Sequence, residues 1–290
     1  MNWVNAILQG ILLGGVFAIS AIGLSLLFGV MRIVNLAHGS LMILAAYLAV
    51  LTVRAVALPT VAAVLIVVPV MAAIGYLTQR TLFERALKIG PLAPLLVTFG
   101  LAIIIPNGLL QVFSQDTAPL PIGSLATDSI SLGANLSAGL FPLLTLVLAV
   151  ALVLGLQQYL GRTRSGRLMR AAADDARTLR LMGVDDRRIY GLATAIAFAT
   201  IAIAGGLYGM RQGGVTPFEG ELTVLFAFET VIIGGLGSLW GTLVGGIALG
   251  VAQAVGAQVS PELPLLFGHL VFLAVLALRP NGLFGRSAPA

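Results

Sequence analysis

Long runs of apolar residues, separated by short polar segments, occupy most of the chain. A helix needs about 20 apolar residues to cross a hydrocarbon core that is about 30 Å thick. The runs are continuous and do not alternate with polar residues, so they predict transmembrane helices and exclude a transmembrane β-barrel. We predict spans at residues 6–30, 39–53, 59–79, 92–113, 139–160, 189–209, 222–236, 239–257 and 263–278.

The number of spans is eight or nine, because the glycine-rich stretch from Val231 to Gly250 can also hold a short or re-entrant segment. No internal repeat and no low-complexity linker divides the chain. We therefore predict a single all-α domain over residues 1–290, a polytopic transmembrane helical bundle.

Composition agrees with a membrane location. Of the 290 residues, 59% are hydrophobic and 9% are charged, whereas about 25% are charged in ordinary soluble domains. The chain has no cysteine, which excludes disulfides, cysteine-ligated metals and thiol catalysis. His269 has no second histidine or carboxylate at metal-ligand spacing, so we expect neither a metal nor a cofactor.

The net charge of +5 comes from basic residues in the loops beside the spans. This position indicates membrane orientation and not nucleic-acid binding. Residues 162–188 hold eight arginines, whereas residues 114–138 hold no lysine or arginine. With nine spans and an external N-terminus, nearly all basic loops are cytoplasmic, and only Arg54 and Arg211 fall on the other side.

The most informative polar segment is the loop at residues 161–188. Residues suited to begin or end short helices recur along it: Ser165, Asp174 or Asp175, Gly183, and Asp185 or Asp186. An apolar side can be formed by Leu168, Met169, Ala172 and Ala173. Short helices with an apolar and a basic face suit a groove on a partner protein. Attachment to anionic lipid is the alternative, although the interleaved aspartates argue against it.

Polar residues at membrane depth are costly, so each is a candidate for the translocation pathway: Asn35, His38, Asn107 and Glu229. The apolar pattern breaks around Asn35 and His38. Such a break can line a solute path, or Asn35 can simply cap the next helix. Asn107 follows Pro106, whose ring frees a backbone carbonyl that the amide could use. Glu229 either faces a watery cavity or pairs with Arg211 or a backbone donor.

Three motifs occur in order along the chain: GLSLLFGVMRIVNLAHG at Gly23–Gly39, SGRLMRAAADDARTLRLMG at Ser165–Gly183, and IGGLGSLWGTLVGG at Ile233–Gly246. They resemble segments of the LivH and LivM permeases of branched-chain amino-acid ABC importers, and the first closely resembles the start of the LivH-type subunit. The resemblance extends over almost the whole chain. One departure is Pro106 before Asn107, where the family is expected to have glutamine.

The resemblance implies a multi-pass permease of the bacterial inner membrane that moves branched-chain amino acids. It also implies four kinds of partner besides membrane lipid: a second homologous permease, two cytosolic ATP-binding subunits, a periplasmic solute-binding protein and the amino-acid substrate. The loop would be a cytoplasmic coupling loop that contacts an ATPase through Ser165, Gly166, Arg167, Arg170, Asp174, Asp175, Leu181 and Gly183. The chain has no phosphate-binding loop of its own, so we expect a non-catalytic subunit.

Other functions stay open on the residues alone. A passive channel fits the glycine-rich spans, but it leaves the basic loop unexplained and lacks a ring of filter groups. Related permeases serve urea, amides or aromatic acids, so the resemblance does not settle the solute. An intramembrane protease would need a pair such as Ser238 and His269, but Ser238 lacks the Gly-x-Ser-x-Gly context.

Overall fold

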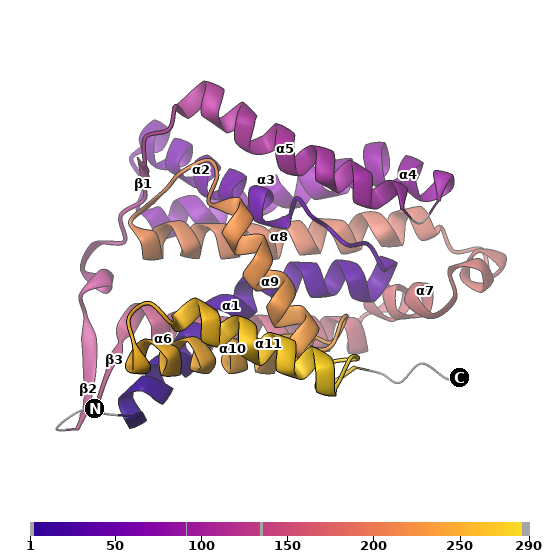
Figure 1. Cartoon of the computed structure of the whole chain (residues 1–290). Coiled ribbons are helices and arrows are strands. Elements are labelled where there is room, and N and C mark those ends of the chain that lie inside the picture. Colours follow the sequence, from indigo (N-terminus) through magenta and orange to yellow (C-terminus); the bar gives the residue numbers. More distant parts are fainter. Residues whose placement is uncertain (1–2, 91, 134–135, 286–290) are drawn as a thin grey trace. The chain divides into compact units, whose positions relative to one another are not determined.

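The computed structural model describes residues 3–90, 92–133 and 136–285 of the chain (Figure 1). Helices dominate it, and each predicted apolar run corresponds to a helix. The α-helices are α1 (Trp3–Met31), α2 (His38–Val56), α3 (Thr60–Thr78), α4 (Glu84–Ile89), α5 (Ala93–Phe113), α6 (Leu140–Arg162), α7 (Arg164–Leu181), α8 (Asp186–Gln212), α9 (Gly220–Gly234), α10 (Leu239–Val259) and α11 (Pro264–Leu278). A π-helical turn, η1 (Gln79–Phe83), joins α3 to α4, and a 3₁₀ turn, η2, spans Gly123–Ala126.

Among the described residues, seven helical segments are long and apolar enough to cross a membrane. They are α1, α2, the segment Thr60–Ile89 from α3 to α4, α5, α6, α8 and α10. The helices α9 and α11 have 15 residues each, which at a rise of 1.5 Å per residue gives about 22 Å, short of the hydrocarbon core. The prediction of eight or nine spans is therefore not confirmed, and the difference lies in these two short helices.

The all-α prediction holds for the spans but not for the segment between α5 and α6. There, β2 (Ser129–Gly133) pairs antiparallel with β3 (Leu136–Gly139), with a bulge between Ser131 and Gly133. A second small sheet joins β1 (Ala118–Pro119) to β4 (Gly214–Val215). These strands were not predicted, because they are too short to give a clear alternating pattern of apolar and polar residues.

The chain forms two compact units, each built from segments that are distant in sequence. One unit combines Met1–Ser25, Ile122–Leu154 and Leu225–Ala290, and the other combines Leu26–Pro121 and Gly155–Val224. The helices α1, α6 and α9 contribute residues to both units. The assignment of the whole chain to one domain stays a prediction.

In the first unit, α1 packs closely against α10 through small residues. A Cβ atom added to Gly10 or Gly14 would meet the backbone of Val251 or Ile247. Close backbone approach of this kind gives helices in lipid the van der Waals contact that the hydrophobic effect cannot supply there. Beside this contact, Phe17, Ile233 and Leu249 form a buried cluster.

In the second unit, α8 is the central helix and packs against both α2 and α3. A Cβ atom on Gly205 would meet the Met42 carbonyl of α2, and a Cβ atom on Gly206 would meet the Val64 side chain of α3. Adjacent glycines thus let α8 approach a neighbour on each side. The N-terminal end of the same helix receives the 161–188 loop, which contains α7.

Candidate functional site

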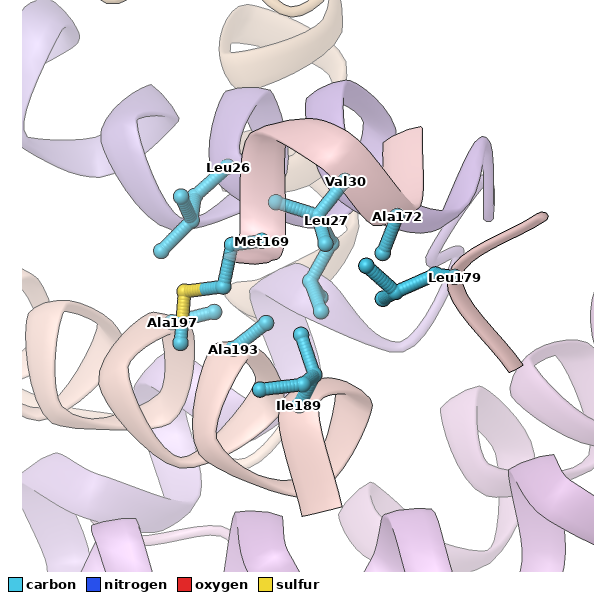
Figure 2. Close-up of a cluster of buried hydrophobic side chains, with 9 residues drawn as sticks. All are labelled: Leu26, Leu27, Val30, Met169, Ala172, Leu179, Ile189, Ala193 and Ala197. Carbon is cyan, nitrogen blue, oxygen red and sulfur yellow. The ribbon is translucent and has the colours of Figure 1, made fainter. Parts of the chain in front are cut away.

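The apolar side of α7 is buried against the end of α1 and the beginning of α8 (Figure 2). Met169 is fully buried, and Ala172 and Leu179 are nearly so. They contact a common set of side chains, which is Leu26, Leu27, Val30, Ile189, Ala193 and Ala197. The predicted apolar side is confirmed at Met169 and Ala172, while Leu168 is partly buried against the same cluster. A movement of α7 would therefore act on α1 and α8 together.

The helix α7 consists of two helical segments that meet at Asp175, whose backbone is not helical (φ −153°, ψ 94°). One carboxylate oxygen of Asp175 accepts the backbone N–H groups of Arg177 (2.9 Å) and Thr178 (3.1 Å), and the other accepts the Thr178 hydroxyl (2.5 Å). These bonds cap the second segment, so the prediction that Asp174 or Asp175 starts it is confirmed at Asp175. The same bonds, led by the one from the Thr178 hydroxyl, lower the pKa of Asp175 below its ordinary value.

The start of α7 differs from the prediction. Thr163, and not Ser165, is the N-cap: its backbone is extended and its hydroxyl accepts the N–H of Gly166 at 3.0 Å. Ser165 is already helical, and its hydroxyl lies 2.7 Å from that of Tyr159. The prediction of Ser165 as the cap was therefore wrong by two positions, because Thr163 and Ser165 are equally suitable residue types.

The end of α7 follows the prediction. Gly183 is left-handed, with φ of 78°. Its N–H bonds the Arg180 carbonyl at 3.0 Å, and the Val184 N–H bonds the Leu179 carbonyl at 3.3 Å. These two bonds form a Schellman motif, in which glycine is favoured because it has no Cβ atom. The Asp185 carboxylate then caps α8 by accepting the Arg187 N–H at 3.1 Å.

The opposite side of the loop is exposed and carries both charge and apolar surface. Arg167, Arg170 and Asp174 are exposed. Leu181 and Met182, at the end of α7, are 82% and 74% exposed. Large apolar side chains at the end of a basic helix give the loop a surface that water solvates poorly.

Gly166 lets the first turn of α7 approach the last turns of α6. A Cβ atom there would lie 2.6 Å from the Leu160 Cα, and it would also meet the Tyr159 carbonyl. We expect Gly166→Ala to lower the free energy of unfolding by about 1–3 kcal/mol, the cost of forcing a methyl group against backbone. Thermal unfolding of the detergent-purified protein measures this change.

The matched control is Gly161→Ala in the last turn of α6, where the nearest atom to an added Cβ lies 3.9 Å away. It should leave stability unchanged or raise it by up to about 1 kcal/mol through helix propensity. Equal effects of the two substitutions would show that Gly166 is not a site of close contact.

The break between α1 and α2 is buried and ordered by polar contacts. Arg32 has a left-handed backbone (φ 55°), and Asn35 and His38 are fully buried. The Asn35 carbonyl oxygen Oδ1 accepts the Ala37 N–H at 3.1 Å, and the Thr98 hydroxyl of α5 accepts the Leu36 N–H at 3.2 Å. Asn35 thus orders the turn that starts α2, which favours the capping interpretation without testing the pathway. Among the described residues, the Asn35 amide nitrogen has no hydrogen-bond partner.

Asn107 lies on the exposed side of α5, and its amide nitrogen donates to the Ile103 carbonyl at 2.8 Å. The carbonyl that Pro106 leaves without an intrahelical donor belongs to Ala102. That carbonyl accepts the hydroxyl of Ser40 from α2, at 3.3 Å. The prediction that Asn107 uses the freed carbonyl is therefore wrong, since Ser40 takes this role.

Glu229 of α9 is buried and hydrogen-bonds through Oε1 to Nδ1 of His269 in α11. The prediction that Glu229 pairs with Arg211 or a backbone donor is therefore wrong. The side chain of His269 is 38% exposed, and that of Glu229 is 3% exposed. His269 is not available in this geometry to pair with Ser238, whose hydroxyl accepts the Gly241 N–H as the N-cap of α10. Among the described residues, no group of three or more histidines and carboxylates could hold a metal.

One charged cluster, around Glu84, was not predicted from the sequence. The carboxylate of Glu84, in α4, lies near three cationic groups: Arg80 at 3.8 Å, Lys88 at 3.2 Å and Arg187 of α8 at 3.1 Å. The four-residue spacing of Arg80, Glu84 and Lys88 on one helix was a usable signal. The contact with Arg187 was not, because it is made between helices.

The seven long apolar helical segments among the described residues, together with the docked loop helix α7, define the class of the protein as a multi-pass α-helical membrane protein. The family described as "Branched-chain amino acid transport system / permease component" matches residues 6–276, so the chain belongs to this family. This match confirms the resemblance inferred from the three sequence motifs.

Individual relatives agree with this assignment. The chain is 30% identical over 300 residues to the high-affinity branched-chain amino acid transport system permease protein BraD of Pseudomonas aeruginosa, covering 98% of this chain and 96% of BraD. It is 28% identical over 300 residues to LivH of Salmonella typhimurium, covering 99% and 96%. It is 30% identical over 151 residues to LivM of Escherichia coli, covering 52% and 35%. No solved structure matches the chain significantly.

Proposed function

We propose that the chain is the non-catalytic permease subunit of an ATP-driven importer for branched-chain amino acids. The observation that carries the proposal is the packing of α7. Its buried side contacts both α1 and α8, and its other side exposes arginines and the apolar residues Leu181 and Met182. A helix of this kind can receive a push from a cytosolic partner and pass it to two transmembrane helices at once. The names of BraD and LivH, both high-affinity branched-chain amino acid permeases, support the choice of solute.

The partners follow from this role. A second permease, similar to LivM in kind, would complete the path across the membrane. Of two ATP-binding subunits, one would contact the exposed side of this loop, at Arg167, Arg170, Asp174, Leu181 and the turn at Gly183. A periplasmic binding protein would deliver the amino acid to the external side.

The translocation pathway is proposed to include Asn35, His38, Asn107 and Glu229. The buried amide nitrogen of Asn35 is a hydrogen-bond donor without a partner among the described residues, and Asn107 presents an amide on an exposed helix side. Closure of the ATP-binding subunits would move α7, and α1 and α8 would then change the side from which the pathway is open. A passive channel is the competing function.

The test compares the unaltered complete complex with the Leu181→Asp variant in proteoliposomes. Copurification of the ATP-binding subunits, leucine-stimulated ATP hydrolysis and leucine uptake are measured for both. Leu181→Asp should reduce copurification of the ATP-binding subunits and leucine uptake by at least about tenfold, since it places a charge in an apolar contact. Ile89→Asp in α4 is the matched control, because Ile89 is also 82% exposed but lies outside the loop.

Two results would contradict the proposal. Leucine flux through the purified chain alone, without ATP, would show a passive channel. Normal ATP-binding subunit association of Leu181→Asp would show that the exposed end of α7 is not the contact. Uptake measured with urea, amides and aromatic acids alongside leucine identifies the solute.

A further inference from the structure

The first turns of α8 have two opposite faces, each packed against a different part of the second unit. Ile189, Ala193 and Ala197 are four residues apart and form the face that contacts α7 and α1. Arg187, Gly191, Thr194 and Phe198 recur at intervals of three or four residues and form the other face. Residues with these spacings lie on one side of an α-helix. The same helix that receives α7 therefore has a second, separate contact surface.

That second face packs against α3, η1 and α4. The Thr194 hydroxyl donates to Oε1 of Gln79 at 2.9 Å, in a buried hydrogen bond. A Cβ atom on Gly191 would lie 2.6 Å from the Tyr76 ring, and a Cβ atom on Gly75 would lie 2.6 Å from the Phe198 ring. The glycines leave no free space at these rings, so the two helices are closely fitted here.

The π-turn η1 determines which α4 residue faces α8. A π-turn accommodates one residue more than an α-turn, so each residue after it takes the angular position of its predecessor in a regular α-helix. Glu84 is five residues after Gln79. Because of the π-turn, Glu84 takes the position that the fourth residue after Gln79 would take in a regular α-helix. Gln79 and Glu84 therefore share one side of the helix. Gln79 reaches Thr194 there, and Glu84 reaches Arg187.

Glu84 joins the two helices at the polar end of this contact. Two of its cationic neighbours, Arg80 and Lys88, belong to its own helical segment, and Arg187 comes from α8. The Glu84 side chain is 18% exposed and that of Arg187 is 55% exposed. Partial burial of the carboxylate makes this ion pair stronger than a fully solvated one.

We propose that Glu84 and Gln79 are positioning residues that tie α3 and α4 to α8, so that a movement of the coupling loop reaches α3 and α4 as well as α1 and α8. This inference rests on the proposed function, because it assigns a role in coupling. Without the tie, α8 would move against α3 and α4 instead of with them. ATP hydrolysis would then continue with less solute moved for each ATP.

The test compares Glu84→Gln, Arg187→Gln and the matched control Lys88→Gln in the complete reconstituted complex. The first two variants should each reduce leucine transported per ATP hydrolysed by about fivefold, the effect of losing one partly buried ion pair. The double variant should be no worse than either single variant, since both remove the same pair. Lys88→Gln removes only an intrahelical neighbour and should leave the ratio within about twofold of the unaltered complex.

A second measurement follows the tie itself. The chain has no cysteine, so spin labels on Ile89→Cys in α4 and Arg188→Cys in α8, attached before assembly of the complex, are the only labels on this subunit and report their separation. Glu84→Gln should broaden the distance distribution, and Lys88→Gln should not. A broadened distribution with an unchanged transport ratio, or equal effects of Glu84→Gln and Lys88→Gln, would overturn the inference. If the unaltered complex shows no leucine-stimulated hydrolysis, the proposed function fails, and an unbroadened distribution would separately disprove the tie.

Discussion

Met169→Asp is expected to release α7 from the helices on which it packs. Met169 is fully buried among apolar side chains of α1 and α8, where a carboxylate would find no hydrogen-bond donor. The substitution should lower the free energy of unfolding by about 3–5 kcal/mol, or detach α7 locally at a smaller global cost. Thermal unfolding measures the first effect. Trypsin cleavage within the loop, which is rich in arginine, measures the second and should become at least about tenfold faster.

Two control substitutions separate the effect of the charge from the effect of its buried position. Met169→Leu keeps the volume and apolar character and should cost less than about 1.5 kcal/mol. Met182→Asp places the same charge on a side chain that is 74% exposed, so it should leave stability and proteolysis nearly unchanged. If Met169→Asp behaves like Met182→Asp, the docking of α7 on α1 and α8 is refuted.

His269→Ala is expected to cost about 3–5 kcal/mol of stability, because it leaves the buried Glu229 carboxylate without its partner. The reason is desolvation: the Glu229 side chain is 3% exposed, so a carboxylate that loses the imidazole has little contact with water to replace the hydrogen bond. Replacing both residues, as Glu229→Leu with His269→Leu, should recover most of the loss, since a well-packed apolar pair needs no partner. Thermal unfolding of the three proteins tests this.

Leucine uptake then separates the two roles considered for Glu229. If the double variant is stable and transports leucine, the pair serves packing. If it is stable but inactive, the carboxylate belongs to the pathway. A His269→Ala protein as stable as the unaltered one would refute the stability prediction itself.

Much of the fold could be predicted because the bilayer imposes a local rule. Each predicted apolar run is helical, since a backbone in hydrocarbon must satisfy its own hydrogen bonds. Length, in contrast, decides whether a helix spans. The predicted run at residues 222–236 corresponds to α9, which ends at Gly234 because Gly235 and Gly237 have left-handed backbones. The predicted run and the helix α9 are equally short, at 15 residues, so the run was apolar enough but not long enough to span.

In the candidate site, features that depend on neighbouring residues could be predicted, and contacts between distant residues could not. Asp175 and Gly183 were predictable because a cap or a left-handed turn depends on the residue and its immediate neighbours. The pairing of Glu229 with His269 was not predictable, since 40 residues separate them and no periodicity relates α9 to α11. The contact between Glu84 and Arg187 was missed for the same reason, and also because a π-turn leaves no clear signature in composition.

The division of α1 between two compact units bears on how the chain is made. The second unit ends at Val224, so all of its segments are synthesised before the final segment of the first unit, Leu225–Ala290. Gly10 and Gly14 must therefore wait for α10 to emerge, which at about 5–20 residues per second is on the order of ten seconds or more. Throughout that interval the small-residue side of α1 lacks its native neighbour. The N-terminal half of α1 therefore needs another neighbour, such as lipid or the insertion machinery, until α10 has been made.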